Sequence, residues 1–178
     1  MACKVPIVET ERLILRAGRV EDFPAYAEMW ARPEVVRYIT GKPLSREEAW
    51  SKFGRMAGLW VLTGYGFWAI EEKASGAFIG EAGVADFRRD MEPSLDGKPE
   101  FGWGLVPSAQ GRGYATEAVL EGLRWAAQSL NARTYCCIIS PKNVASIRVA
   151  ERCGFVKSAE TAYKGEASII YERPAPQR

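Results

Sequence analysis

Residues 100–139 constrain the fold more than any other part of the chain. Residues 100–106 have the pattern of a strand, and apolar side chains spaced by three and four predict a helix over 112–130. Thr134–Ile139 is a continuous apolar run, typical of a strand that is buried on both faces. Strand, helix and strand in this order predict a right-handed crossover between two parallel strands. The segment therefore indicates an α/β fold.

The remaining segments predict elements that complete a single sheet. Strand patterns cover residues 12–16, 67–70, 77–84, 155–162 and 167–171, and helix patterns cover 20–30, 46–63 and 144–153. Ser45 and Glu48 have the spacing of a capping box, and Pro33 is expected to end the first helix. We expect an α/β (α+β) fold, a mixed, mainly antiparallel twisted sheet flanked by about four helices. A length of 178 residues suits one domain, residues 1–178.

The charge balance and the apolar pattern limit the partners. Lys and Arg number 24 and Asp and Glu number 22, a net charge of +2, which argues against a nucleic-acid partner but allows a local basic site. No run approaches the ~20 apolar residues that cross a membrane. The first ten residues carry Lys4 and Glu9 in place of the apolar run of a secretion signal, so we expect a cytoplasmic protein. The aromatic content permits a homodimer without indicating one.

The chain contains no histidine and four cysteines, Cys3, Cys136, Cys137 and Cys153. Without histidine or a CxxC pair we expect no metal site and no nucleophile that depends on imidazole. Cys136 and Cys137 are adjacent in a predicted strand, where their side chains point to opposite faces and cannot easily pair. Any chemistry must therefore use other groups.

The sequence Gln-Gly-Arg-Gly-Tyr-Ala over residues 110–115 lies between a predicted strand and a long helix. Glycines allow a tight turn there, and the first amides of the helix add unpaired donors, so the segment can hold phosphate oxygens beside Arg112. A plain strand-to-helix turn is the alternative. The chain lacks the Gly-Lys-Ser/Thr of a Walker loop, and the acidic residue of a Rossmann site is missing from residues 131–139.

Four motifs in order then resemble one known family. PSAQGRGYATEA (107–118) is similar to the Q/R-x-x-G-x-G/A pyrophosphate motif of the GNAT N-acetyltransferases. ETERLILR (9–16), EFGW (100–103) and NVASIRVAERCGF (143–155) resemble the RimJ/RimL branch of that family. Members of this branch acetylate N-terminal amines of ribosomal proteins or small amines. The resemblance spans nearly the whole chain.

The resemblance implies acetyl-CoA as co-substrate, held in a cleft where a bulge separates the central strand from its parallel neighbour. The pantetheine arm would pair with the backbone of Trp103, Gly104 and Leu105, and an N–H there would polarise the thioester carbonyl. Asn143 would contact the pantetheine, although a role as helix N-cap is equally compatible. The pyrophosphate would bind to Gln110, Gly111, Arg112, Gly113, Tyr114, Ala115 and Thr116.

The implied reaction is direct attack of an amine on acetyl-CoA while both are bound. Glu100 is our first candidate for the base that takes the amine proton, with Glu81 or a water relay as alternatives. For either carboxylate, a solvated charge at a strand end is the competing interpretation. Ser146 matches the family pattern for a group near the thiol, against the alternative of a locally satisfied helix serine. Ala150 stands where several family members have a tyrosine acid.

The acceptor pocket is expected between the early helices and the loops 38–44 and 88–98. The acceptor could be a peptide N-terminus, a polyamine, an amino acid or an antibiotic amine. A second hypothesis is a catalytically weak acyl-CoA-binding or regulatory module. A third, an RNA-associated protein at the ribosome, is disfavoured by the charge balance.

Overall fold

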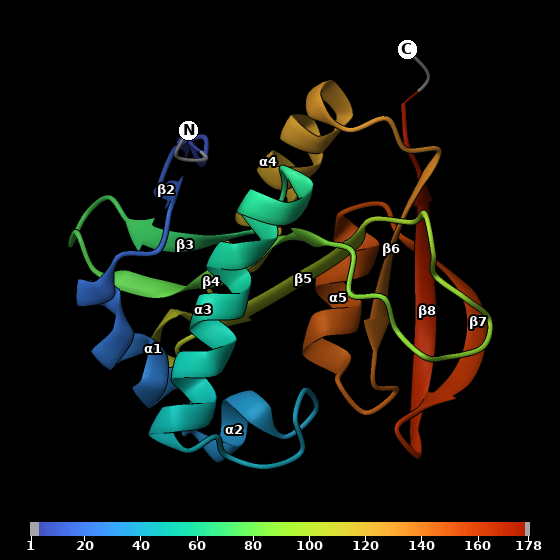
Figure 1. The fold of residues 1–178 in the computed structure, drawn as a ribbon, viewed down its shortest axis with the longest axis horizontal. Helices are drawn as coiled ribbons and strands as arrows, with labels where there is room; N and C mark the ends of the chain where they lie inside the picture. The colour runs from blue at the N-terminus through green and yellow to red at the C-terminus, as the bar shows by residue number, and fades with distance from the viewer. Residues whose placement is uncertain (1–3, 177–178) are drawn as a thin grey trace.

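The computed structural model describes residues 4–176 and contains one eight-stranded sheet in the order β1-β2-β3-β4-β5-β6-β8-β7 (Figure 1). The strands are β1 Val8–Glu9, β2 Leu13–Arg16, β3 Phe67–Glu72, β4 Phe78–Ala85, β5 Glu100–Leu105, β6 Thr134–Ile139, β7 Val156–Tyr163 and β8 Glu166–Pro174. Every neighbouring pair is antiparallel except β5 and β6. The mixed, mainly antiparallel sheet with one parallel pair is confirmed.

Five α-helices are present in the described residues, against the four expected. They are α1 Phe23–Trp30, α2 Pro33–Val36, α3 Arg46–Thr63, α4 Tyr114–Ser129 and α5 Val144–Arg152. The additional helix is α2, because Pro33 suits a first helical position as well as the stop of the helix before it. The capping box is confirmed: Ser45 Oγ accepts from the Glu48 N–H at 3.1 Å, and Glu48 Oε2 accepts from the Ser45 N–H at 2.7 Å.

The two faces of the sheet carry different side chains. Phe101 packs in one buried cluster with Val119 of α4, and Trp68 packs in another with Ala118 of the same helix. On the opposite face Phe67 packs against α3, which lies across the strands in Figure 1. Because side chains alternate along a strand, this second face also receives Glu81. We call it the α1/α3 face.

The parallel strands β5 and β6 share only one residue pair, Glu100 with Cys136. The Cys136 N–H donates to Pro99 O at 3.1 Å, and beyond this point the two strands diverge. The β4–β5 register continues without a shift, and a register shift lies between Ile70 and Glu71 in the β3–β4 pair. The expected splay is present at the junction of β5 and β6, because the strands share one pair, but the expected bulge in the central strand is not found: the β4–β5 ladder is regular.

The three described cysteines are free and buried. Burial raises the pKa of Cys153 to about 11 and that of Cys136 to about 12. The prediction that Cys136 and Cys137 do not pair is confirmed, and Cys3 lies outside the described residues. Among residues 4–176, no helix has both the length and the apolar character needed to span a membrane.

Candidate active site

The glycine-containing turn before α4 exposes a row of backbone donors. Gly111 and Gly113 have φ values of +73° and +82°, a conformation that side-chain-bearing residues rarely adopt. None of the N–H groups of residues 111–116 donates a hydrogen bond to another group within the described chain. Because these amides include the unpaired first turn of α4, the positive end of its dipole lies there too. The turn thus presents a row of unpaired backbone donors beside Arg112, including the amides of Ala115 and Thr116.

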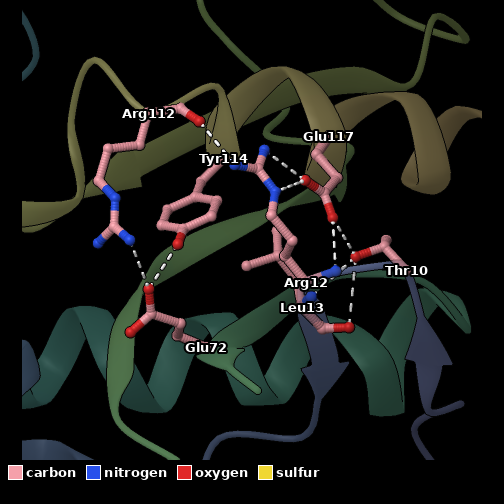
Figure 2. A network of polar contacts seen from close by, with 7 residues as sticks. All are labelled: Thr10, Arg12, Leu13, Glu72, Arg112, Tyr114 and Glu117. Atoms are coloured by element: carbon pink, nitrogen blue, oxygen red, sulfur yellow. Dashed lines mark hydrogen bonds and ion pairs between the residues drawn. The ribbon is translucent and has the colours of Figure 1, made fainter. Parts of the chain in front are cut away.

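A network of polar contacts holds this turn against Thr10 and Arg12, which lie between β1 and β2 (Figure 2). The Glu117 carboxylate accepts from Thr10 Oγ1 at 2.6 Å, from the Arg12 N–H at 3.0 Å and from Arg12 Nε at 2.7 Å. Arg12 Nη1 also donates to Arg112 O at 2.9 Å. Burial works to raise the pKa of Glu117, but the bonds from Thr10 and Arg12 outweigh it and lower that pKa. The turn is therefore positioned before any ligand arrives.

The side chain of Tyr114 belongs to the same network. Its ring lies between two guanidinium groups, 4.5 Å from Arg12 Cζ and 4.7 Å from Arg112 Cζ, and its hydroxyl donates to Glu72 (Figure 2). Arg112 Nη2 lies 3.1 Å from Glu72 Oε1. The expected contact of Tyr114 with the cofactor is thereby limited to its backbone. The sequence contained no signal for Glu72, whereas Arg12 and Glu117 lay unremarked inside the motifs.

The β4–β5 ladder decides which backbone groups of β5 face the gap toward β6. The Val106 N–H donates to Ile79 O, and hydrogen-bonded pairs alternate along an antiparallel ladder. Trp103 and Leu105 therefore turn their backbone groups toward β6, beyond the single paired residue. Gly104 turns its N–H and C=O toward β4. This register disagrees with the expected backbone pairing of Gly104 with the pantetheine, and what Gly104 leaves at this face is the absence of a side chain.

Gln110 connects the turn to this strand. Its Nε2 donates to Leu105 O at 3.1 Å, which satisfies one of the carbonyls that point toward the gap. The Leu105 N–H and both backbone groups of Trp103 are left facing β6. These three groups are the backbone donors and acceptor available to an extended ligand.

Both candidate carboxylates are buried, so the interpretation as solvated charges is wrong for each. Glu100 is 6% exposed, and its two oxygens accept from Arg89 Nε and Nη2, both at 2.7 Å. Glu81 is 4% exposed, and its Oε1 accepts from Lys52 Nζ at 2.7 Å. Neither cation partner, Arg89 or Lys52, was predictable from the sequence. Because both oxygens of Glu100 accept hydrogen bonds from Arg89, Glu100 is poorly placed to take a proton.

The start of α5 lies after β6. Asn143 is confirmed as the helix N-cap, since its Oδ1 accepts from the Ser146 N–H at 3.1 Å. This bond leaves the Asn143 side-chain NH₂ without a described partner. Ser146 is half-buried, and its hydroxyl bonds to none of the residues in the described range. Position 150 is an alanine, which has no hydroxyl, and it is fully buried.

A turn with unpaired backbone amides at the start of a helix, next to a pair of parallel strands that diverge, is the geometry that the resemblance implied. Residues 12–156 match the family model described as an acetyltransferase (GNAT) domain. The chain belongs to the GNAT acetyltransferase family. The matched segment includes the turn, both diverging strands and α5.

Individual GNAT proteins are similar over most of the chain. An uncharacterised N-acetyltransferase, p20 of Bacillus licheniformis, is 28% identical over 83% of this chain and 81% of its own. The crystal structure of an acetyltransferase from Agrobacterium tumefaciens is 31% identical, with a TM-score of 0.82, covering 97% of this chain and 96% of that one.

A more distant structure shares the fold alone. It is RimL, a ribosomal L7/L12 α-N-protein acetyltransferase in complex with coenzyme A, at 19% identity and a TM-score of 0.76. The alignment covers 95% of this chain and 98% of RimL.

Proposed function

We propose that this GNAT domain, residues 1–178, transfers the acetyl group of acetyl-CoA to a primary amine by direct attack while both substrates are bound. The observation that carries the proposal is the continuity of unpaired backbone groups from the β5–β6 gap to the turn before α4. An extended arm could pair with Trp103 and Leu105, while a pyrophosphate reaches the amides of residues 111–116.

Acetyl-CoA supplies an activated acetyl thioester when it is bound. The residues proposed to hold it are Trp103, Leu105, Gln110, Gly111, Arg112, Gly113, Tyr114, Ala115, Thr116 and Asn143, while Gly104 leaves room for it by lacking a side chain. Arg112 is half-exposed beside the turn and can move from Glu72 toward a phosphate. The N–H of Trp103 or Leu105 can polarise the thioester carbonyl, because both groups point into the gap.

A carboxylate near Gly104 is proposed to take the proton of the acceptor ammonium. Glu81 lies opposite Gly104 in the ladder and has one oxygen bonded to Lys52, whereas Glu100 has both oxygens bonded to Arg89. These contacts favour Glu81 over Glu100 as the base. Ser146, whose hydroxyl is unbonded, is the candidate to protonate the departing thiolate.

We further propose that the protein is a RimJ/RimL-like enzyme of the cytoplasm. The four motifs support the branch, and its acceptors would be protein N-termini or small amines. The buried free thiols suit a reducing compartment.

The proposal is tested by incubating the protein with acetyl-CoA and a panel of acceptors while the release of thiol is measured. The panel comprises peptides with free N-termini, polyamines and single amino acids, and the same peptides with blocked N-termini serve as controls. We expect release to require both protein and a free amine. Calorimetry with coenzyme A is run in parallel. Absence of binding would overturn the cofactor assignment, and binding without turnover on any amine would overturn the enzymatic one.

A further inference from the structure

Lys52 belongs to α3, and its ammonium group is enclosed between that helix and the α1/α3 face of the sheet. Lys52 Nζ lies 2.7 Å from Glu81 Oε1 and 4.2 Å from the centre of the Trp30 ring. The rings of Tyr26 and Phe67 lie 5.9 Å and 6.0 Å from the same nitrogen. A carboxylate with several aromatic faces is an arrangement by which proteins recognise cationic ligands. We call the four residues around the nitrogen, Tyr26, Trp30, Phe67 and Glu81, the ammonium box.

The ammonium box borders the proposed site of acetyl transfer. Glu81 is the ladder partner of Gly104, so its side chain leaves the sheet on the face where Gly104 has none. A Cβ placed on Gly104 would lie 3.8 Å from Trp30 Cζ2. At position 104, therefore, no side chain lies between the ammonium box and the β5 backbone that would hold the thioester.

Two polar atoms in the walls of the box make no hydrogen bond of normal geometry. Tyr26 Oη and Trp30 Nε1 are buried, in residues that are 1% and 2% exposed, and Tyr26 Oη interacts only loosely with Glu81 and Trp30. Burial, together with the charge of Glu81, raises the pKa of Tyr26, which keeps its hydroxyl protonated. A cavity of about 60 Å³ lies alongside, lined in part by Tyr26, Phe78 and Glu81. Buried polar atoms normally find partners, so the box has binding capacity that Lys52 does not use.

We propose that the ammonium box binds the primary ammonium group of the acceptor, and that Lys52 occupies it until an acceptor displaces it. The inference rests on the proposed function, because it identifies where that function takes its amine. The acceptor group would be a primary ammonium on an unbranched carbon chain, since such a group is already accommodated in the form of Lys52. Lys52 then acts as a tethered competitor, which weakens the binding of every acceptor.

The first test removes the competitor. In Lys52→Met the side chain keeps its length and loses its charge. We measure the binding of n-butylammonium chloride by calorimetry. We expect it to bind this variant about tenfold more tightly than the wild type, because the tethered Lys52 ammonium of the wild type competes at a millimolar effective concentration. Lys73→Met is the matched control, since it removes another ion-paired lysine, which is bonded to Glu9 and Thr10 and contacts none of the four box residues. Equal affinities in all three proteins would overturn the proposal.

A second measurement uses the wild-type protein, in case Lys52→Met does not fold. The side-chain ammonium signals of ¹⁵N-lysine-labelled protein are followed by NMR while n-butylammonium is added. We expect the Lys52 signal to shift and saturate while the Lys73 signal stays in place, and a stationary Lys52 signal would overturn the proposal. Neither measurement depends on turnover. Coenzyme A binding, measured separately, therefore distinguishes failure of the ammonium box from failure of the acetyltransferase assignment.

Discussion

Glu81 and Gly104 lie directly opposite each other where β4 pairs with β5. One contributes a buried carboxylate to the α1/α3 face, and the other has no side chain there, so that an added Cβ would lie 3.8 Å from Trp30 Cζ2. An acid next to bare backbone, on the strand pair that borders the β5–β6 gap, suits the proposed reaction between an amine and a thioester.

Adding a methyl group at position 104 should separate activity from folding. In Gly104→Ala the new Cβ has no neighbour closer than Trp30 Cζ2 at 3.8 Å, so we expect urea unfolding to change by less than about 1 kcal/mol. The methyl group would stand between donor and acceptor, and kcat/KM should fall about 100-fold. Gly58→Ala, which meets no atom within 4 Å on α3, is the control. An unchanged kcat/KM in Gly104→Ala would remove this position from the site.

The left-handed glycine at the start of α4 offers a matched pair of variants. Gly113→Ala and Gly165→Ala place a side chain at φ values of +82° and +81°, at a similar cost of about 1 kcal/mol each. Only Gly113 belongs to the anion-binding turn. We expect calorimetry to show weaker acetyl-CoA binding for Gly113→Ala and unchanged binding for Gly165→Ala. Equal effects in the two variants would mean that strain alone is responsible.

The two buried carboxylates should respond differently to neutralisation. Glu81→Gln is expected to lower kcat about 100-fold at pH 7, with recovery at higher pH, where the acceptor amine loses its proton unaided. Glu100→Gln leaves the half-buried Arg89 without its partner, so we expect a loss of about 2 kcal/mol in unfolding free energy. The pH–rate profile checks the first expectation and urea unfolding the second. If Glu100→Gln produced the larger loss in kcat, the order of the two candidates would be reversed.

Ser146 provides a narrower test of proton donation to the thiolate. Because Asn143 caps the backbone N–H of Ser146 and not its hydroxyl, Ser146→Ala should leave α5 intact by circular dichroism. We expect kcat to fall about tenfold, at the lower end of such contributions. Turnover within assay error of the wild type would reject Ser146 as the donor.

Acid should weaken the attachment of Thr10 and Arg12, which precede β2, to Glu117 of α4. The folded-state pKa of Glu117 lies below its usual value of 4.5, so its stabilising contribution is complete above that pH. The contribution is lost as the pH falls through the lowered value. Glu117→Gln should cost about 1 kcal/mol at pH 7 and progressively less toward pH 3, as measured by urea unfolding. A difference that does not depend on pH would contradict the role of the charge.

The elements were largely predictable from sequence because each has a local signal. Thr134–Ile139 is one apolar run, and Ser45 with Glu48 marks the start of α3. The pairs that shape the site were not predictable, since Lys52 and Glu81 are 29 residues apart and Tyr114 and Glu72 are 42 apart. No periodicity connects such residues. They meet only because the strand order brings their elements together.

The single residue pair between β5 and β6 divides the sheet into a block of five strands, β1 to β5, and a block of three, β6 to β8. The pantetheine arm of acetyl-CoA in the gap would supply the missing hydrogen bonds between β5 and β6, so the bound ligand would complete the sheet. Binding to the folded state alone raises its stability by mass action. We therefore expect the lifetime of this protein in a cell to follow the supply of acetyl-CoA, with faster proteolysis when carbon is scarce.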